Sequence, residues 1–250
     1  MGLLNVTDIK SVDELESIAK KYLENKRLKD VMAEITQSDE VSRVMSKAGV
    51  GYVVEEGLFS IPRNSTAGAD IEHLAVEIKT SPLTLGADGK LRVKEPLSLN
   101  IINYNEEYKN SHISESSLYK KNKTILFVWY IHDKEKPRSE YLIKYVFIWE
   151  MDTLVQEELN KDYLLILDKI KSGNAHNIHQ SDHDYLTLCP KHGGTFKDPN
   201  DRKSKTTQPF SESPAEIRAF RLKNSYMTKV IRRHLLKNQP DSVSEFIAEK

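Results

Sequence analysis

Four short runs of β-branched and aromatic residues lie in the middle of the chain, each bounded by polar, glycine or proline breaks. They cover residues 74–80, 97–103, 124–131 and 141–149. Such runs predict strands, and the Asp88-Gly89 pair between the first two indicates a hairpin. Because helical patterns flank the strands on both sides, the sequence predicts a mixed α/β domain.

Helices are expected at both ends of this strand region. Ser11 and Glu14 form a capping-box pair in front of an apolar stripe of helical period, which predicts a helix over residues 11–26. Further helical patterns cover residues 41–58, 153–171 and 224–237. Residues 173–214 are polar and lack a clear period, which predicts a long loop or an irregular lobe of functional use.

Charge is distributed unevenly, although the net charge of the 250 residues is zero. Between Cys189 and Lys237 the sequence has twelve Lys and Arg residues and four acidic residues. This local excess favours a surface that binds a polyanion, and a solvated basic surface is the alternative.

The sequence lacks the usual signals for export and for a membrane span. No apolar run is long enough for a membrane span, and the N-terminus lacks the features of a secretory signal peptide. Cys189 is the single cysteine, which is typical of a reducing compartment. A cytoplasmic protein with no membrane partner is therefore expected.

The segment GADIEHLAVEIKT, residues 68–80, carries charges in otherwise apolar company. Alternate residues of a strand share a face, so Glu77 and Lys79 should point one way and Ile78 the other. A bend before the strand would bring Asp70 beside Glu77. Two carboxylates near a lysine suit a Mg²⁺ site for phosphodiester hydrolysis, whereas a charged strand that simply faces solvent is the alternative.

Several ordered blocks around this segment resemble the MutH family of DNA endonucleases. That family includes the mismatch-repair nicking enzyme and the type II restriction enzymes that cut GATC, and the resemblance is stronger to the catalytic N-terminal domain of the restriction branch. The blocks span about residues 47–236 and read KAGVGYVVEEGLF, LSLNIINYNEE, SSLYKKNKTILF and RAFRLKNSYMTKVIRRHLL. The resemblance implies a restriction-endonuclease-like core of the PD-(D/E)xK type. Such a core has a mixed central sheet flanked by helices and a DNA-binding cleft between two lobes.

The resemblance also implies roles for individual residues. Asp70 and Glu77 match metal-binding carboxylates, and Lys79 matches the catalytic lysine. The backbone carbonyl of Ile78 would be a further Mg²⁺ ligand. The remaining matches to catalytic residues are Glu55 and Lys121.

On the DNA-binding side, Lys191 matches a loop lysine of the family that reaches bases. Arg221 stands where the nicking enzyme has a tyrosine that senses adenine methylation, so cleavage irrespective of methylation is expected. Further basic residues are candidates for phosphate contacts, with a solvated helix face as the alternative. These are Lys223, Lys229, Arg232 and Arg233.

We therefore expect a type II site-specific endonuclease that hydrolyses double-stranded DNA at GATC with Mg²⁺. A single endonuclease domain would cover residues 1–250, with a catalytic lobe over residues 40–150 and a recognition part over residues 174–237. A non-cleaving MutH-like DNA-binding module is the alternative. Dimerisation on DNA and a further C-terminal domain remain open, and zinc binding by the His-rich segment 176–192 is less favoured than a polar loop.

Overall fold

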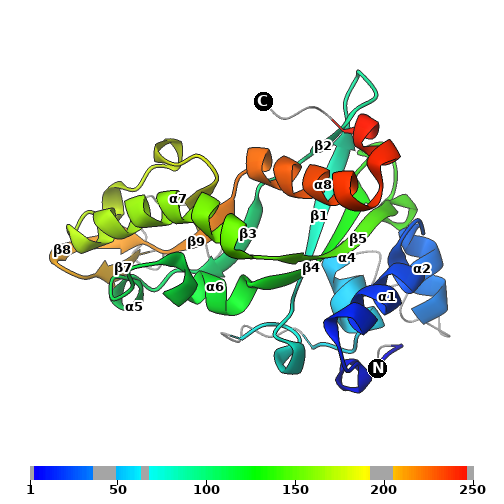
Figure 1. Cartoon of the computed structure of the whole chain (residues 1–250), viewed down its shortest axis with the longest axis horizontal. Helices are drawn as coiled ribbons and strands as arrows, with labels where there is room; N and C mark the ends of the chain where they lie inside the picture. The colour runs from blue at the N-terminus through cyan, green and yellow to red at the C-terminus, as the bar shows by residue number, and fades with distance from the viewer. Residues whose placement is uncertain (1–2, 36–48, 63–67, 192–204, 247–250) are drawn as a thin grey trace. The chain divides into compact units, whose positions relative to one another are not determined.

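The computed structural model describes residues 3–35, 49–62, 68–191 and 205–246 (Figure 1). The chain forms two compact units, and each unit is assembled from separate stretches of sequence. The first contains residues 1–95, 124–150 and 230–250, and the second contains residues 96–123 and 151–229. The two units thus interleave along the chain, whereas the lobes expected from the sequence follow one another.

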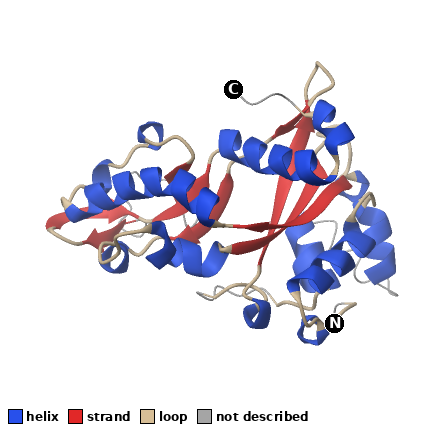
Figure 2. Ribbon diagram, in the orientation of Figure 1, coloured by secondary structure: helices blue, strands red, loops and turns tan. Residues whose placement is uncertain are grey.

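A four-stranded mixed sheet forms the centre of the first unit (Figure 2). Its order is β2-β1-β4-β5, where β1 pairs parallel with β4 and the other two pairs are antiparallel. Gly89, at φ +73°, turns the chain between β1 and β2, as the Asp-Gly pair predicted. The strand bounds are β1 (Glu77–Leu85), β2 (Leu91–Val93), β4 (Thr124–Ile131) and β5 (Leu142–Glu150).

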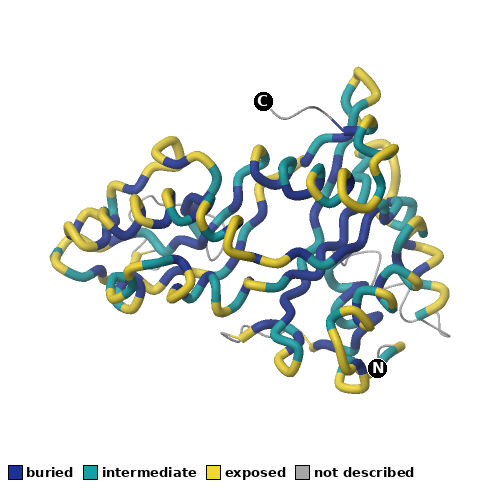
Figure 3. The backbone as a smooth tube through the Cα atoms, in the orientation of Figure 1, coloured by how far each residue is buried: buried dark blue, intermediate teal, exposed yellow. Residues whose placement is uncertain are grey.

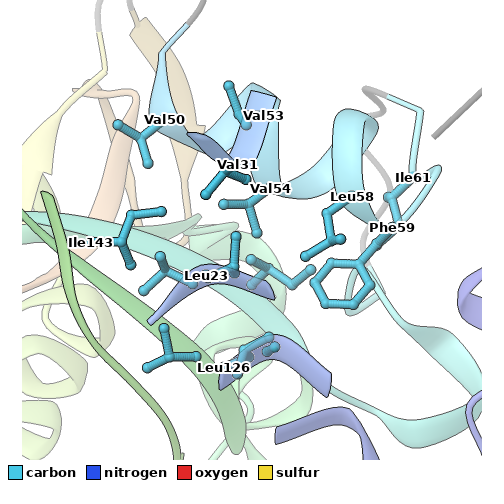
Figure 4. Packing of buried hydrophobic residues seen from close by; sticks show 14 of the residues in the cluster. Leu23, Val31, Val50, Val53, Val54, Leu58, Phe59, Ile61, Leu126 and Ile143 are labelled. Atoms are coloured by element: carbon cyan, nitrogen blue, oxygen red, sulfur yellow. The ribbon is translucent and has the colours of Figure 1, made fainter. Parts of the chain in front are cut away.

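Helices cover one face of this sheet and bury a common core. Ser11 caps the first helix by accepting a hydrogen bond from the Glu14 N–H at 3.1 Å. Apolar side chains of the helices pack against Leu126 and Ile143 of the sheet (Figure 4), and Figure 3 shows the strands as largely buried. The helical segments are α1 (Val12–Leu23), α2 (Leu28–Ile35), α4 (Val50–Tyr52) and a π-helical turn (Val53–Leu58).

The second unit is built on a three-stranded antiparallel sheet of order β3-β9-β6. A separate hairpin pairs β7 with β8. The bounds are β3 (Leu97–Ile101), α5 (Tyr104–Glu107), α6 (Ser117–Asn122), α7 (Thr153–Lys171), β6 (Leu186–Pro190), β7 (Lys205–Gln208), β8 (Ser211–Glu216) and β9 (Arg218–Leu222). Helix α8 (Asn224–Asn238) begins in this unit and ends in the first.

Most expected elements are confirmed, the start of one strand is wrong, and for residues 173–214 the lobe fits better than the long loop. The strand expected at residues 74–80 begins only at Glu77, because Glu72–Leu74 is a 3₁₀ turn and Ala75 has φ +53°. The segment 173–214 is not all loop, since it contains β6, β7 and most of β8. Of the helix expected at residues 41–58, residues 41–48 lie outside the described part of the chain. No helix among the described residues has both the length and the apolar character that a membrane crossing requires.

Candidate active site

A tight hairpin in front of β1 brings Asp70 and Glu77 together. The backbones of Ile71 and Val76 exchange two hydrogen bonds, one from the Ile71 N–H at 2.9 Å and one from the Val76 N–H at 3.2 Å. A 3₁₀ turn and then Ala75, in the left-handed region, close the loop between them. The two acidic residues are therefore neighbours across a hairpin, although six residues separate them in sequence.

The two carboxylates are held by backbone donors of the opposite arm. The Ile78 N–H donates to Asp70 Oδ2 at 2.9 Å, and the Asp70 N–H donates to Glu77 Oε2 at 3.2 Å. Glu77 is only 2% exposed, whereas Asp70 is half-buried. Because a buried carboxylate is costly without partners, this reciprocal bonding both stabilises the hairpin and fixes the direction of the two side chains.

Lys79 forms an ion pair with Glu77 Oε1. This contact confirms the prediction that Glu77 and Lys79 share a face of β1, as residues two apart in a strand do. The Lys79 side chain is 23% exposed, so the ammonium group lies between the buried carboxylate and solvent. The hairpin and the start of β1 thus place two carboxylates and one ammonium in a single partly open cluster.

Glu55 reaches β1 from a different direction. It lies on the π-helical turn, and a Cβ built at Gly51 would be 3.3 Å from Glu55 Oε1 and 3.4 Å from Thr80 Oγ1. The glutamate carboxylate and the threonine hydroxyl therefore both lie next to Gly51. Strand alternation puts Thr80 on the face opposite Lys79, so Glu55 approaches β1 from that other face.

Thr80 is a residue that the sequence did not single out. A threonine in a strand is ordinary, and its position beside Glu55 depends on how the preceding helical segment turns. π-Helical turns recur at functional sites. A sequence signal existed only in the Gly51-x-x-x-Glu55 spacing, which puts the glycine one helical turn before the glutamate.

The donor chemistry of the Asp70–Glu77 pair fits Mg²⁺. Mg²⁺ is usually bound through one or two carboxylates, with the other positions taken by water and substrate phosphate. Among the described residues no group of three or more His, Cys, Asp and Glu side chains is arranged to hold a metal ion. A two-carboxylate site for Mg²⁺ needs no larger group of such side chains.

The candidate zinc ligands of the His-rich segment have other partners. His183 Nδ1 is 3.1 Å from the His179 carbonyl, and His176 Nδ1 is 2.9 Å from Gln208 Nε2. Cys189 is buried, with its Sγ 3.8 Å from Ser98 Oγ, and residue 192 lies outside the described residues. These contacts favour a role in folding this segment.

Lys121 lies on α6 in the second unit and is half-buried. Strand β4 follows this helix almost at once, and Ile125 of β4 is the register partner of Glu77. Four residues of extended chain reach at most about 14 Å. The part of Lys121 in the reaction stays a prediction.

Two of the candidate DNA-binding lysines are engaged within the second unit. Lys223 donates from its ammonium group to the backbone carbonyl of His183. Lys229 forms an ion pair with Glu158 at 2.7 Å and lies 5.0 Å from the centre of the Tyr185 ring. Their side chains therefore stabilise the unit, and their contact with DNA stays a prediction.

The other basic candidates occupy more varied positions. Arg221 lies in β9, the middle strand of its sheet, with Ser98 and Thr187 as its register partners on either side. Lys191 directly follows β6, and its N–H donates to the Ile217 carbonyl at 2.8 Å. On the part of α8 in the first unit, one arginine is half-buried and the next is exposed, namely Arg232 and Arg233.

Comparison with known proteins finds a family model and a restriction enzyme that are similar to this chain. Residues 59–162, which contain the Asp70–Glu77 hairpin, Lys79 and Lys121, match the family model of the DNA mismatch repair enzyme MutH. The chain is also 30% identical over 228 residues to the type II restriction enzyme Sau3AI of Staphylococcus aureus. That alignment covers 89% of the chain and 44% of the relative, so the chain spans less than half of the relative's length. Both similarities support a MutH-like restriction endonuclease family for this chain.

Proposed function

We propose that this chain is a catalytic endonuclease domain that hydrolyses phosphodiester bonds of double-stranded DNA at GATC with Mg²⁺. The observation that carries the proposal is the cluster of Asp70, Glu77 and Lys79, in which backbone hydrogen bonds fix both carboxylates and an ion pair fixes the lysine. The relatives, a mismatch repair enzyme and a type II restriction enzyme, support DNA as the substrate. The GATC site follows from the resemblance of the sequence blocks to the enzymes that cut it.

In this proposal Asp70, Glu77 and the carbonyl of Ile78 would hold Mg²⁺. The bound ion would lower the pKa of water and offset negative charge on the phosphoryl group. Lys79 donates hydrogen bonds from beside the carboxylates, where it can orient a nucleophilic water or stabilise charge that develops on phosphate oxygens. Since the hairpin holds both carboxylates before DNA arrives, little reorganisation is required when the substrate binds.

DNA recognition would fall to the second unit and to α8. Lys191 and Arg221 are the proposed base contacts, and the basic residues of α8 would meet phosphates. Arginine in place of a tyrosine that senses methylation favours cleavage of both methylated and unmethylated GATC. Parallel digestion of plasmids with and without adenine methylation tests this, and protection of the methylated plasmid would contradict it.

A plasmid assay tests the proposed activity. The wild-type chain, Glu77→Ala and Lys79→Ala are incubated at low salt with Mg²⁺ and a GATC-containing plasmid, and a site-free plasmid serves as the control. We expect the wild type alone to cut, and only at the site. Tight GATC binding without cleavage would instead indicate a non-cleaving DNA-binding module, and neither activity would indicate an interaction protein.

A further inference from the structure

The two arms of the Asp70–Glu77 hairpin differ in how firmly they are held. Glu77 is the first residue of β1, which pairs in parallel with β4 from this residue onward. Asp70 lies on the arm in front of β1, and the backbone pairing of this arm is an isolated bridge between Ile71 and Val76. Since a lone short hairpin is at best marginally stable, the position of Asp70 depends on support from outside the hairpin.

His73 supplies such support from the turn of the hairpin. It lies in the 3₁₀ turn between the two arms, and its Nε2 is 2.9 Å from the backbone carbonyl oxygen of Ile9. Because a carbonyl oxygen can only accept a hydrogen bond, the His73 Nε2 carries the proton and donates. This bond joins positions that are 64 residues apart in the sequence. The hairpin is thus fastened at its turn to the N-terminal part of the first unit.

The hydrogen-bond partner of His73 is itself held in place. Ile9 is 3% exposed and belongs to the hydrophobic core of the first unit. The Lys10 N–H donates to Glu14 Oε2 at 2.7 Å, and Ser11 caps α1 by accepting from the Glu14 N–H. His73 therefore anchors the hairpin to the start of a packed helix.

Residues 3–9, which we call the N-terminal strap, also hold the segment that carries Glu55. Two backbone N–H groups at the start of the strap donate to carbonyls of the π-helical turn, at 2.9 Å and 2.8 Å. A serine hydroxyl two residues after that turn donates to the strap at 2.8 Å. These bonds run from Leu3 to Gly57, from Leu4 to Leu58 and from Ser60 to Leu4. The strap is thus bonded at one end to the π-helical turn and at the other end, through His73, to the hairpin.

We propose that His73 is a positioning residue, which holds Asp70 where Asp70 and Glu77 together bind a divalent cation. The inference rests on the proposed function, because it adds a residue to the Mg²⁺ site assigned there. Mg²⁺ demands a near-ideal octahedral arrangement of its ligands, so a carboxylate that shifts out of place binds it less well. Residues that orient metal ligands without touching the metal typically change metal affinity or activity by about 10–100-fold when they are replaced.

Variants at His73 separate the hydrogen bond from the ring that makes it. His73→Ala removes the donor, whereas His73→Gln keeps an N–H donor for the Ile9 carbonyl. Thr7→Ala is the matched control, because Thr7 is exposed on the strap and its hydroxyl bonds within the strap, to Asn5 Oδ1 at 2.9 Å. The first readout is the Mg²⁺ concentration that gives half-maximal single-turnover cleavage of a GATC duplex. The others are the Tm and the Kd of Ca²⁺, which also prefers oxygen ligands, titrated by calorimetry into the chain with the duplex present.

We expect His73→Ala to raise the half-maximal Mg²⁺ concentration and the Ca²⁺ Kd by roughly tenfold. His73→Gln and Thr7→Ala should leave both near the wild-type values. A lower Tm for His73→Ala with both values unchanged would mean that His73 stabilises the fold alone, and this would overturn the inference while the endonuclease activity stands. Equal losses of cation affinity in His73→Ala and His73→Gln would overturn it as well.

A second variant covers the case in which His73→Ala fails to fold. His73→Asn keeps a polar side chain, but it is one methylene shorter than glutamine and its amide falls short of the Ile9 carbonyl. Its half-maximal Mg²⁺ concentration and Ca²⁺ Kd should rise as expected for His73→Ala, and wild-type values would overturn the inference. A folded wild-type chain that cuts no duplex would overturn the proposed function, and the Ca²⁺ titration would then decide the role of His73 by itself.

Discussion

The Ile78 N–H donates a hydrogen bond of 2.9 Å to the carboxylate of Asp70. This bond closes the hairpin that brings Asp70 beside Glu77, so Asp70 has two roles. Its oxygen supports the local fold, and its negative charge is available for a cation. The two roles can be separated, because an asparagine offers the same acceptor without the charge.

We expect Asp70→Asn to abolish Mg²⁺-dependent cleavage while the Tm stays close to that of the wild type. Asp70→Ala should lose cleavage and also destabilise the chain by about 1–3 kcal/mol, because it leaves the Ile78 N–H without its acceptor. Thermal unfolding by circular dichroism and plasmid cleavage are measured on the same samples. Equal destabilisation by the two variants would contradict the structural role assigned to the acceptor.

A substitution at Gly51 should disturb the geometry of the site without lowering the stability of the chain. An added Cβ would lie 3.3 Å from Glu55 Oε1, so this carboxylate must shift by a few tenths of an ångström, and 3.4 Å from Thr80 Oγ1. Alanine in a helix is otherwise more favourable than glycine by about 0.5–1 kcal/mol. We therefore expect Gly51→Ala to keep or raise the Tm and to lower the cleavage rate, by on the order of tenfold.

Gly49→Ala is the matched control for this change. It lies two residues earlier, and a Cβ there meets no atom within 4 Å among the described residues. Cleavage by Gly49→Ala should equal that of the wild type. If the two alanine variants cleave at the same rate, the position of Glu55 does not matter for the reaction.

The stability of the first unit should fall as the pH is lowered below about 6.5. The His234 ring stacks on Phe147 with 3.8 Å between ring centres. Burial, helped by Lys20 and Lys237 and opposed by Glu16, lowers the pKa of His234 to about 4. Between about pH 6.5 and 4 the unfolded chain therefore binds the proton and the folded chain does not, so the free energy of unfolding decreases with decreasing pH.

Urea unfolding at pH 7.5, 6 and 5 measures this dependence. His234→Phe should keep the stacking and make the slope of stability against pH shallower over this range. An identical slope for wild type and His234→Phe would show that another group is responsible.

The basic residues of α8 should differ in their effect on DNA affinity. Lys229 is held by Glu158 and by the Tyr185 ring, whereas Arg233 is exposed. If Arg233 contacts a phosphate, Arg233→Gln reduces the slope of log affinity against log salt by about 0.9. Lys229→Gln should change the slope less and lower the Tm more. Binding titrations at several salt concentrations and thermal unfolding measure the two effects. A larger change of slope for Lys229→Gln than for Arg233→Gln would contradict the prediction.

Sequence patterns predicted those parts of the fold that depend on local chemistry. The apolar run of β4 and the helical pattern of α7 have the bounds expected from their residues. Alternation also predicted the Glu77–Lys79 pair, because a strand leaves little choice of face. The start of β1 was not predictable in this way, since Ala75 takes a left-handed conformation that its sequence does not announce.

The remaining features depend on contacts between distant segments. The strands β7 and β8 are polar and lack apolar alternation, so only their mutual pairing reveals them. Glu55 meets β1 near Thr80 because a π-helical turn redirects it. The Tyr163 hydroxyl donates a hydrogen bond to buried Glu107, more than fifty positions away, and no local pattern in the sequence encodes such a contact.

The central claim is that Asp70, Glu77 and Lys79 form a Mg²⁺-dependent site for cutting DNA at GATC. The most direct measurement is cleavage of an end-labelled GATC duplex by wild type and Asp70→Asn, each with Mg²⁺ and with a chelator. We expect the wild type to cut within the site only when Mg²⁺ is present, and folded Asp70→Asn to bind the duplex and leave it intact. Cleavage by the wild type in the chelator, or equal cleavage by Asp70→Asn, would contradict the claim.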